Sequence, residues 1–110
     1  MNNIQRLQME IKDITIDDNE LIVYLQENGL QPHQSYDATS HSNKRGIYAS
    51  ALQVLESIAN NPTMMSAIKI DDMTVSTFHE NLMARIDQLE RKLRTMPKSD
   101  SNSNIFMLYM

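Results

Sequence analysis

The sequence predicts an all-α fold, a small bundle of about four helices, and three observations support this prediction. Apolar residues recur at steps of three and four in four separate segments, which is the period of an amphipathic helix. Helix-capping residues and helix-ending glycine or proline stand at the borders of these segments. Only one stretch between helices, within residues 63–76, alternates between apolar and polar residues as a strand does. We therefore expect helices to form the core.

The composition is typical of a single soluble domain. The 110 residues are 41% hydrophobic and 22% charged, and cysteine is absent, which excludes a disulfide framework and a thiolate metal site. No stretch reaches the length of a membrane span, and the first residues lack the features of a signal peptide, so we expect synthesis in the cytoplasm. Fourteen acids and ten bases give a net charge of -4. Because the bases are mostly interleaved with acids, no phosphate-binding surface is expected.

The first two helices are predicted to be short. Apolar residues share one face of the first helix: Ile4, Leu7, Ile11 and Ile14. A second helix is predicted over residues 18–28, with Asp17 as its N-cap and Glu20 as the partner of Asp17 in a capping box. Gly29 can adopt the left-handed conformation that ends a helix, and Leu30 can then fold back onto the last turn.

The last two helices are predicted to be longer and to pack as an antiparallel pair. A loop over residues 31–40 precedes a helix that begins near Ser42. Its apolar stripe comprises Ile47, Tyr48, Ala51, Leu52, Leu55, Ile58 and Ala59. The final helix begins between Thr74 and Thr77 and ends near Met96, with one stripe formed by Phe78, Leu82, Ile86, Leu89, Leu93 and Met96. A short connection between two amphipathic helices favours antiparallel packing.

Residues 63–76, which we call the arm, are predicted to be extended or to form a hairpin. Ile68 and Ile70 alternate with charged residues there, and the arm carries more apolar side chains than a solvated loop requires. Five of its residues are therefore candidates for a subunit interface: Met64, Met65, Ile68, Ile70 and Met73. Two of the nine methionines, Met83 and Met96, lie beside or on the stripe of the final helix and are predicted to be core.

The C-terminal end is predicted to be a unit separate from the helical domain of residues 1–96. Pro97 blocks continuation of the helix, and the polar residues 97–103 have too little apolar surface to fold, so they are expected to form a flexible tether. The residues that follow are apolar and β-prone, a pattern typical of a strand that adds to the edge of a partner's sheet. This tail comprises Asn104, Ile105, Phe106, Met107, Leu108, Tyr109 and Met110. A terminal strand docked on its own domain is the alternative.

The sequence offers no constellation that would support catalysis. His79 and Glu80 begin like the helix of a zinc protease, but Met83 occupies the position of the second histidine, so a solvated or capping role is expected. The acidic residues 17–20 lack the alternation of a calcium-binding loop, and two glycines cannot form a phosphate-binding loop. We therefore expect a protein that is not an enzyme and that has no cofactor and no metal.

Four stretches carry a resemblance to a known family. They are residues 15–18 (TIDD), 25–30 (LQENGL), 44–59 (KRGIYASALQVLESIA) and 70–76 (IDDMTVS), the last leading into the long final helix. Their order resembles that of the small head-tail connector (adaptor) proteins of tailed bacteriophages, over about residues 15–94. The last stretch is the most specific, because the family often has Gly-Asp-x-Ser/Thr-Val-Ser there. Asp71 stands where that glycine would be.

The resemblance implies a structural protein of the virion. Such adaptors are small helical bundles that form a ring, typically a dodecamer, beneath the portal protein and link it to the next tail component. In several of them the C-terminal tail reaches into the portal, and the lumen of the ring could pass DNA without specific recognition. The alternative from another class is a small acidic regulatory module, such as an antitoxin, whose tail folds on a partner protein. No basic DNA-recognition helix is visible in the sequence.

Overall fold

A computed structural model describes residues 1–12, 14–61, 63 and 74–96. This part of the chain forms four helices, which are α1 (Asn3–Glu10), α2 (Asp18–Glu27), α3 (His41–Ala59) and α5 (Val75–Thr95). The only β pairing among the described residues is an isolated bridge between Asn2 and Ser35. The all-α prediction is confirmed for the described residues. Most of the arm, together with the tether and the tail, lies outside them.

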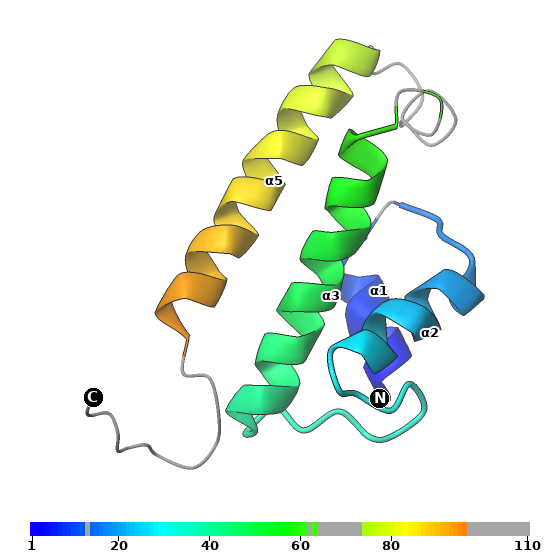
Figure 1. The fold of residues 1–110 in the computed structure, drawn as a ribbon, viewed down its shortest axis with the longest axis vertical. Coiled ribbons are helices and arrows are strands. Elements are labelled where there is room, and N and C mark those ends of the chain that lie inside the picture. The colour runs from blue at the N-terminus through cyan, green and yellow to red at the C-terminus, as the bar shows by residue number, and fades with distance from the viewer. Residues whose placement is uncertain (13, 62, 64–73, 97–110) are drawn as a thin grey trace.

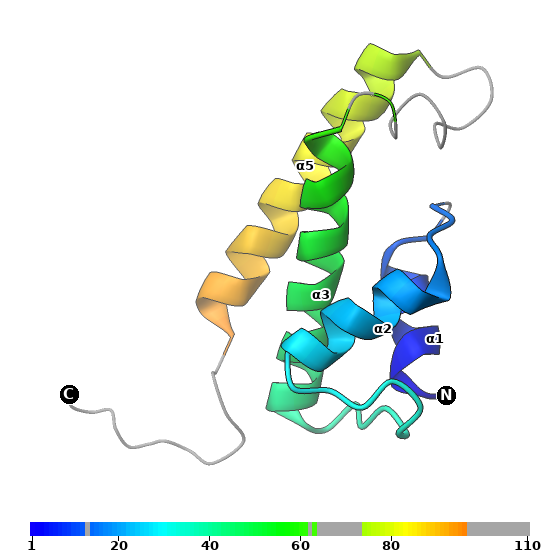
Figure 2. The same cartoon turned by 45° about the vertical axis from the view of Figure 1, so that its right-hand side comes forward.

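Helix α3 is the central element of the bundle. Helix α5 packs along one side of α3, while α1 and α2 pack against α3 and against each other on another side (Figures 1 and 2). Among the described helices, α5 lies alongside α3 alone. The two long helices run in opposite directions (Figure 1), so the predicted antiparallel pair is confirmed.

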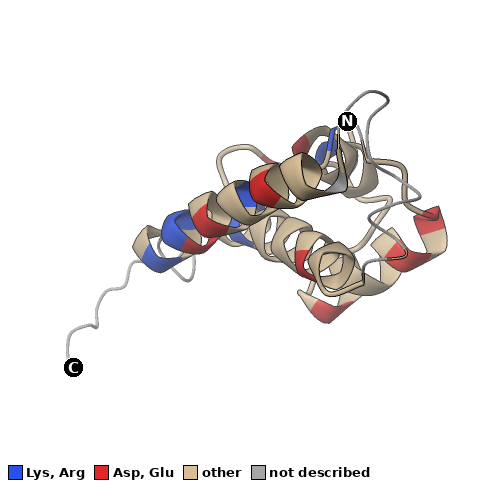
Figure 3. Cartoon of the chain, turned by 90° about the horizontal axis from the view of Figure 1, so that it is seen from above, with Lys and Arg blue, Asp and Glu red and all other residues tan. Residues whose placement is uncertain are grey.

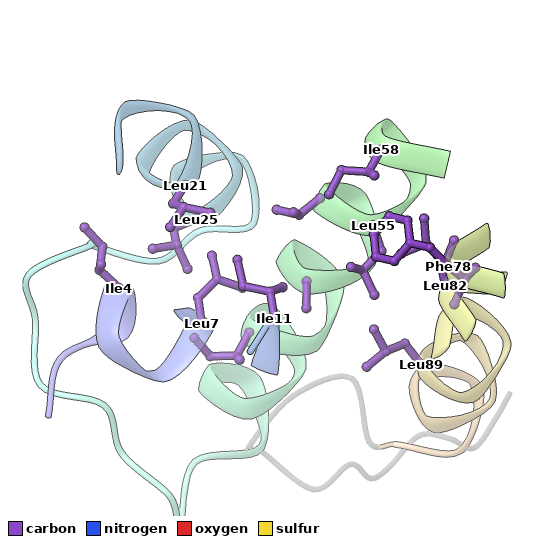
Figure 4. Close-up of a cluster of buried hydrophobic side chains, with 14 residues drawn as sticks. Ile4, Leu7, Ile11, Leu21, Leu25, Leu55, Ile58, Phe78, Leu82 and Leu89 are labelled. Atoms are coloured by element: carbon purple, nitrogen blue, oxygen red, sulfur yellow. The ribbon is translucent and has the colours of Figure 1, made fainter. Parts of the chain in front are cut away.

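The core lies where the apolar faces of α1, α2 and α5 meet α3 (Figure 4). Its buried residues are Ile4, Leu7, Ile11, Leu21, Leu25, Ile47, Ala51, Val54, Leu55, Ile58, Phe78, Leu82, Ile86 and Leu89. The predicted stripe of α5 is therefore confirmed as far as Leu89, while Leu93 and Met96 are half-buried. The prediction that Met83 is core is wrong, because its side chain is 45% exposed. One step along a helix turns a side chain by about 100°, and this step carries Met83 from the core face of Leu82 towards solvent.

Two N-caps start the first helices. The Asp17 carboxylate accepts a hydrogen bond from the Asn19 N–H (3.2 Å), which confirms the predicted cap of α2. The Glu20 N–H does not bond to the Asp17 side chain as a capping box requires. It donates instead to the backbone carbonyl of Asp17 (3.0 Å). A capping box stands at α1, where Asn2 and Gln5 satisfy each other's backbone N–H groups. Its Asn-x-x-Gln spacing was readable from the sequence.

The C-terminal end of α2 fits closely against α3. Gly29 has a φ of 80°, which confirms the predicted left-handed cap. The Gly29 N–H donates to the Gln26 carbonyl and the Leu30 N–H to the Leu25 carbonyl, the two bonds of a Schellman motif. Leu30 then folds against Gly46 of α3, where a Cβ atom would stand 2.8 Å from Leu30 Cδ1. Gly46 therefore allows the end of α2 to approach α3.

A buried asparagine joins α1 to the loop over residues 31–40 and to α3. Asn3 is 1% exposed; its amide Nδ2 donates to the Gln31 carbonyl (2.8 Å), and its Oδ1 accepts from Asn43 Nδ2 (2.9 Å). The Asn3 backbone N–H donates to the Gln34 carbonyl (3.1 Å). The predicted loop is thus held in place by hydrogen bonds to residues far from it in the sequence.

Candidate functional site

The residues that the sequence selected as binding sites lie outside the described part of the chain. These are the five interface candidates of the arm, Met64, Met65, Ile68, Ile70 and Met73, and all seven residues of the tail. Their roles stay predictions. The structure does place the points at which the arm and the tether attach. Because α3 and α5 are antiparallel, the arm joins them at one end of the pair, and the tether continues from the other end (Figure 1).

The charged side chains of the described residues are unevenly distributed, although acids and bases interleave along α5 as the sequence indicates. Helix α2 and its cap carry four acidic residues and no base: Asp17, Asp18, Glu20 and Glu27. The last two turns of α5 and the first turns of α3 gather five bases: Lys44, Arg45, Arg91, Lys92 and Arg94. Asp87 and Glu90 precede those of α5. In Figure 3, basic residues gather at the end of α5 next to the C-terminus, and most acidic residues lie towards the other side of the molecule. A sequence signal existed, since no lysine or arginine stands between Lys12 and Lys44.

A groove lies between the start of α3 and the end of α5, where these bases gather. This basic groove has a volume of about 320 Å³ and is lined by His41, Lys44, Tyr48, Lys92, Thr95 and Met96. The Lys92 Nζ lies 4.8 Å from the centroid of the Tyr48 ring, a cation–π distance. Arg45 Nη1 donates to the Leu93 carbonyl (2.6 Å) and ties the two helices together there. The groove therefore combines an aromatic wall with a cationic rim.

The outer surface of α2 has the opposite character. A shallow hollow of about 470 Å³ lies along it, lined by Asn19, Glu20, Val23, Tyr24 and Glu27. We call these five residues the acidic face. Glu20 and Glu27 are exposed, and Val23 between them is 49% exposed. An apolar side chain thus lies between two carboxylates on one side of the helix.

A third hollow, of about 340 Å³, lies between α1 and α5 over Leu55 of α3. Glu10 and Arg85 both line it and form an ion pair that connects α1 to α5. Glu10, whose side chain is 10% exposed, also accepts a hydrogen bond from Arg6 Nη1 (2.9 Å). Burial lowers the pKa of Arg6, but hydrogen bonds to Glu10 and Tyr36 outweigh it and raise that pKa overall. The Glu10 carboxylate therefore lies between two guanidinium groups, those of Arg6 and Arg85.

Replacing Glu10 with glutamine is expected to lower the free energy of unfolding by about 1–2 kcal/mol, because two cations lose their carboxylate and Arg6 is largely buried. Chemical denaturation of the two proteins measures the difference. The matched control is Asp87→Asn, which breaks the exposed ion pair between Asp87 and Arg91 on α5 and should cost less than about 0.5 kcal/mol. Equal effects of the two substitutions would show that Glu10 does not act as a buried anchor.

The described residues hold no candidate metal site. None of them form a group of three or more histidine or acidic side chains close enough to hold a metal ion. His79 is half-buried, and its Nδ1 is buried without a hydrogen-bond partner, so this histidine is less solvated than expected. Glu80 is exposed, as expected. None of the four described helices has both the length and the apolar content needed to cross a membrane.

Comparisons with known proteins give no assignment. The chain matches no protein-family model, no curated protein sequence and no solved structure. Its function is therefore inferred from its own residues.

Proposed function

We propose that this chain is a structural subunit of a head-tail connector ring in a tailed bacteriophage. The ring would dock beneath the portal protein and link it to the next tail component. The observation that carries the proposal is the ordered series of stretches 15–18, 25–30, 44–59 and 70–76 before a long final helix, which resembles that family. Two features of the described residues are consistent with it: a helical bundle and a long final helix.

The position of α5 supports a role for the tail in attachment. Helix α5 packs along α3, and its C-terminal end lies on the side of the bundle away from α1 and α2 (Figure 2). The tether starts at the end of α5, so its seven residues could span roughly 20 Å at about 3.3 Å per residue. That reach would carry residues 104–110 beyond the bundle. We infer that these residues add as a strand to a sheet of the portal, with the arm residues contacting neighbouring subunits.

Deletion of residues 104–110 is expected to abolish attachment to the portal and to leave the helical domain folded. The alternating side chains of an extended tail would be apolar on both faces, so the partner must bury both. The measurement is co-purification with the portal protein from the same genome, with circular dichroism to confirm helicity.

The matched control keeps the tail at full length and replaces residues 105–110 with serine and glycine. Loss of portal binding in both variants would assign the binding to the apolar side chains. A truncated protein that bound the portal with undiminished affinity would contradict the proposed role of the tail. Binding of the intact chain to a small protein toxin instead of a portal would favour the antitoxin-like alternative.

A further inference from the structure

We propose that copies of this chain associate head to tail, with the acidic face of α2 from one copy seated in the basic groove of the next. The proposal rests on the ring assigned under the proposed function, and it names the contact between neighbouring subunits. The occupant of the basic groove is thus a second copy of the chain.

Charge complementarity is the first reason for this pairing. Glu20 and Glu27 are seven positions apart on α2, which places them on the same side of the helix about 10 Å from each other. The basic groove presents Lys44 from α3 and Lys92 from α5 at its rim. Arg91 and Arg94 add positive charge nearby, while Asp87, already paired with Arg91, and Glu90 reduce it. The end of the molecule that holds the groove stays basic overall.

The apolar centres of the two surfaces also match. Val23 is 49% exposed between the two carboxylates of the acidic face. The basic groove offers Tyr48 and Met96, both half-buried, between its cationic groups. An apolar centre with a charged rim is the usual organisation of a protein interface. Seating Val23 against Tyr48 would bury both and bring the carboxylates to the lysines.

The placement of the charges decides the orientation of the contact. A symmetric contact through α2 would place acidic face against acidic face and add local repulsion to that of two copies with a net charge of -4. A contact between the acidic face and the basic groove places opposite charges against each other instead. Such heterologous contacts repeat from copy to copy and close into a ring when the rotation allows. The acidic and basic surfaces lie on different sides of the molecule (Figure 3), as a repeating contact requires.

Two charge-reversed variants test the pairing. The first carries Glu20→Lys and Glu27→Lys, and the second carries Lys44→Glu and Lys92→Glu. Each alone would meet a surface of its own sign and should associate at least tenfold more weakly than the native chain. An equal mixture of the two restores opposite charges at every contact and should recover association. Sedimentation velocity at low ionic strength measures this, because salt screens exposed charges beyond about 10 Å at 0.1 M.

A matched control reverses the exposed Glu80 of α5, which belongs to neither surface, and should leave association unchanged. Circular dichroism verifies that each variant is folded. If the native chain associates but the mixture does not recover, the ring would use another contact, and portal binding would still test the proposed function separately. A native chain that stays monomeric at about 0.1 mM in low salt would overturn the head-to-tail proposal. Association of the mixture, when neither variant associates by itself, would establish the head-to-tail contact.

Discussion

Replacing Leu89 with alanine is expected to lower the free energy of unfolding by about 2–5 kcal/mol. Leu89 is fully buried (0% exposed) and belongs to the α5 stripe that packs against α3 (Figure 4). Because α5 packs along α3, the shared face of these two helices holds α5 in the bundle, together with the ion pair between Arg85 and Glu10 of α1. Truncation removes buried methyl groups from that face and leaves a cavity. Urea denaturation should show a lower midpoint with an unchanged slope.

Met83 on the same helix provides the matched control. Its side chain is 45% exposed, so Met83→Ala should cost less than about 1 kcal/mol. Both substitutions introduce alanine into the interior of α5, so helix propensity changes little between them. Similar losses of stability for Leu89→Ala and Met83→Ala would show that the buried face of α5 has been assigned incorrectly.

Replacing Asn3 with leucine is expected to lower the free energy of unfolding by about 1–3 kcal/mol, although leucine is the more apolar residue. The substitution leaves the Gln31 carbonyl and the Asn43 amide without the bonds that Asn3 gives them. Both bonds are part-buried, and a polar group left unpaired in such a site costs more than a hydrogen bond contributes. The start of α1 and the loop over residues 31–40 should also exchange amide hydrogens faster, which hydrogen-exchange measurements can locate.

The control for Asn3 is Gln8 on the same helix. Its exposed side chain donates to Asp18 Oδ1 (3.2 Å), so Gln8→Ala should change stability by no more than about 0.5 kcal/mol. If Asn3→Leu stabilised the protein instead, the buried hydrogen bonds would contribute less than the apolar burial gained.

Local patterns accounted for most of the fold. The four helices, the Asp17 and Gly29 caps and the apolar stripe of α5 all depend on residues within a few positions of one another. Met83 shows the limit of such patterns. A stripe read at steps of three and four does not say how wide the buried face is, and the width depends on how closely α3 approaches α5.

Apart from the antiparallel pairing of the last two helices, contacts between distant residues were not predicted. Asn43 reaches Asn3 across 40 positions, and Arg85 reaches Glu10 across 75, and neither pair has a local signal. The candidate binding residues also fall into two groups, those selected from the sequence and those found in the structure. The tail and arm residues were selected from sequence alone and lie outside the described residues. The acidic face lies on one helix and had a sequence signal, whereas the basic groove emerged only from the folded chain.

The sequence by itself determined the helical class of this protein, its apolar faces and most of its helix ends. The reason is that helical hydrogen bonds and the repeat of 3.6 residues per turn act over short distances along the chain. The tertiary structure alone decided which charges share a surface. Lys44 and Lys92 are 48 positions apart, and only the antiparallel packing of α3 on α5 brings them to one groove. Electrostatic complementarity depends on distance in space, and no local pattern in a single sequence records that distance.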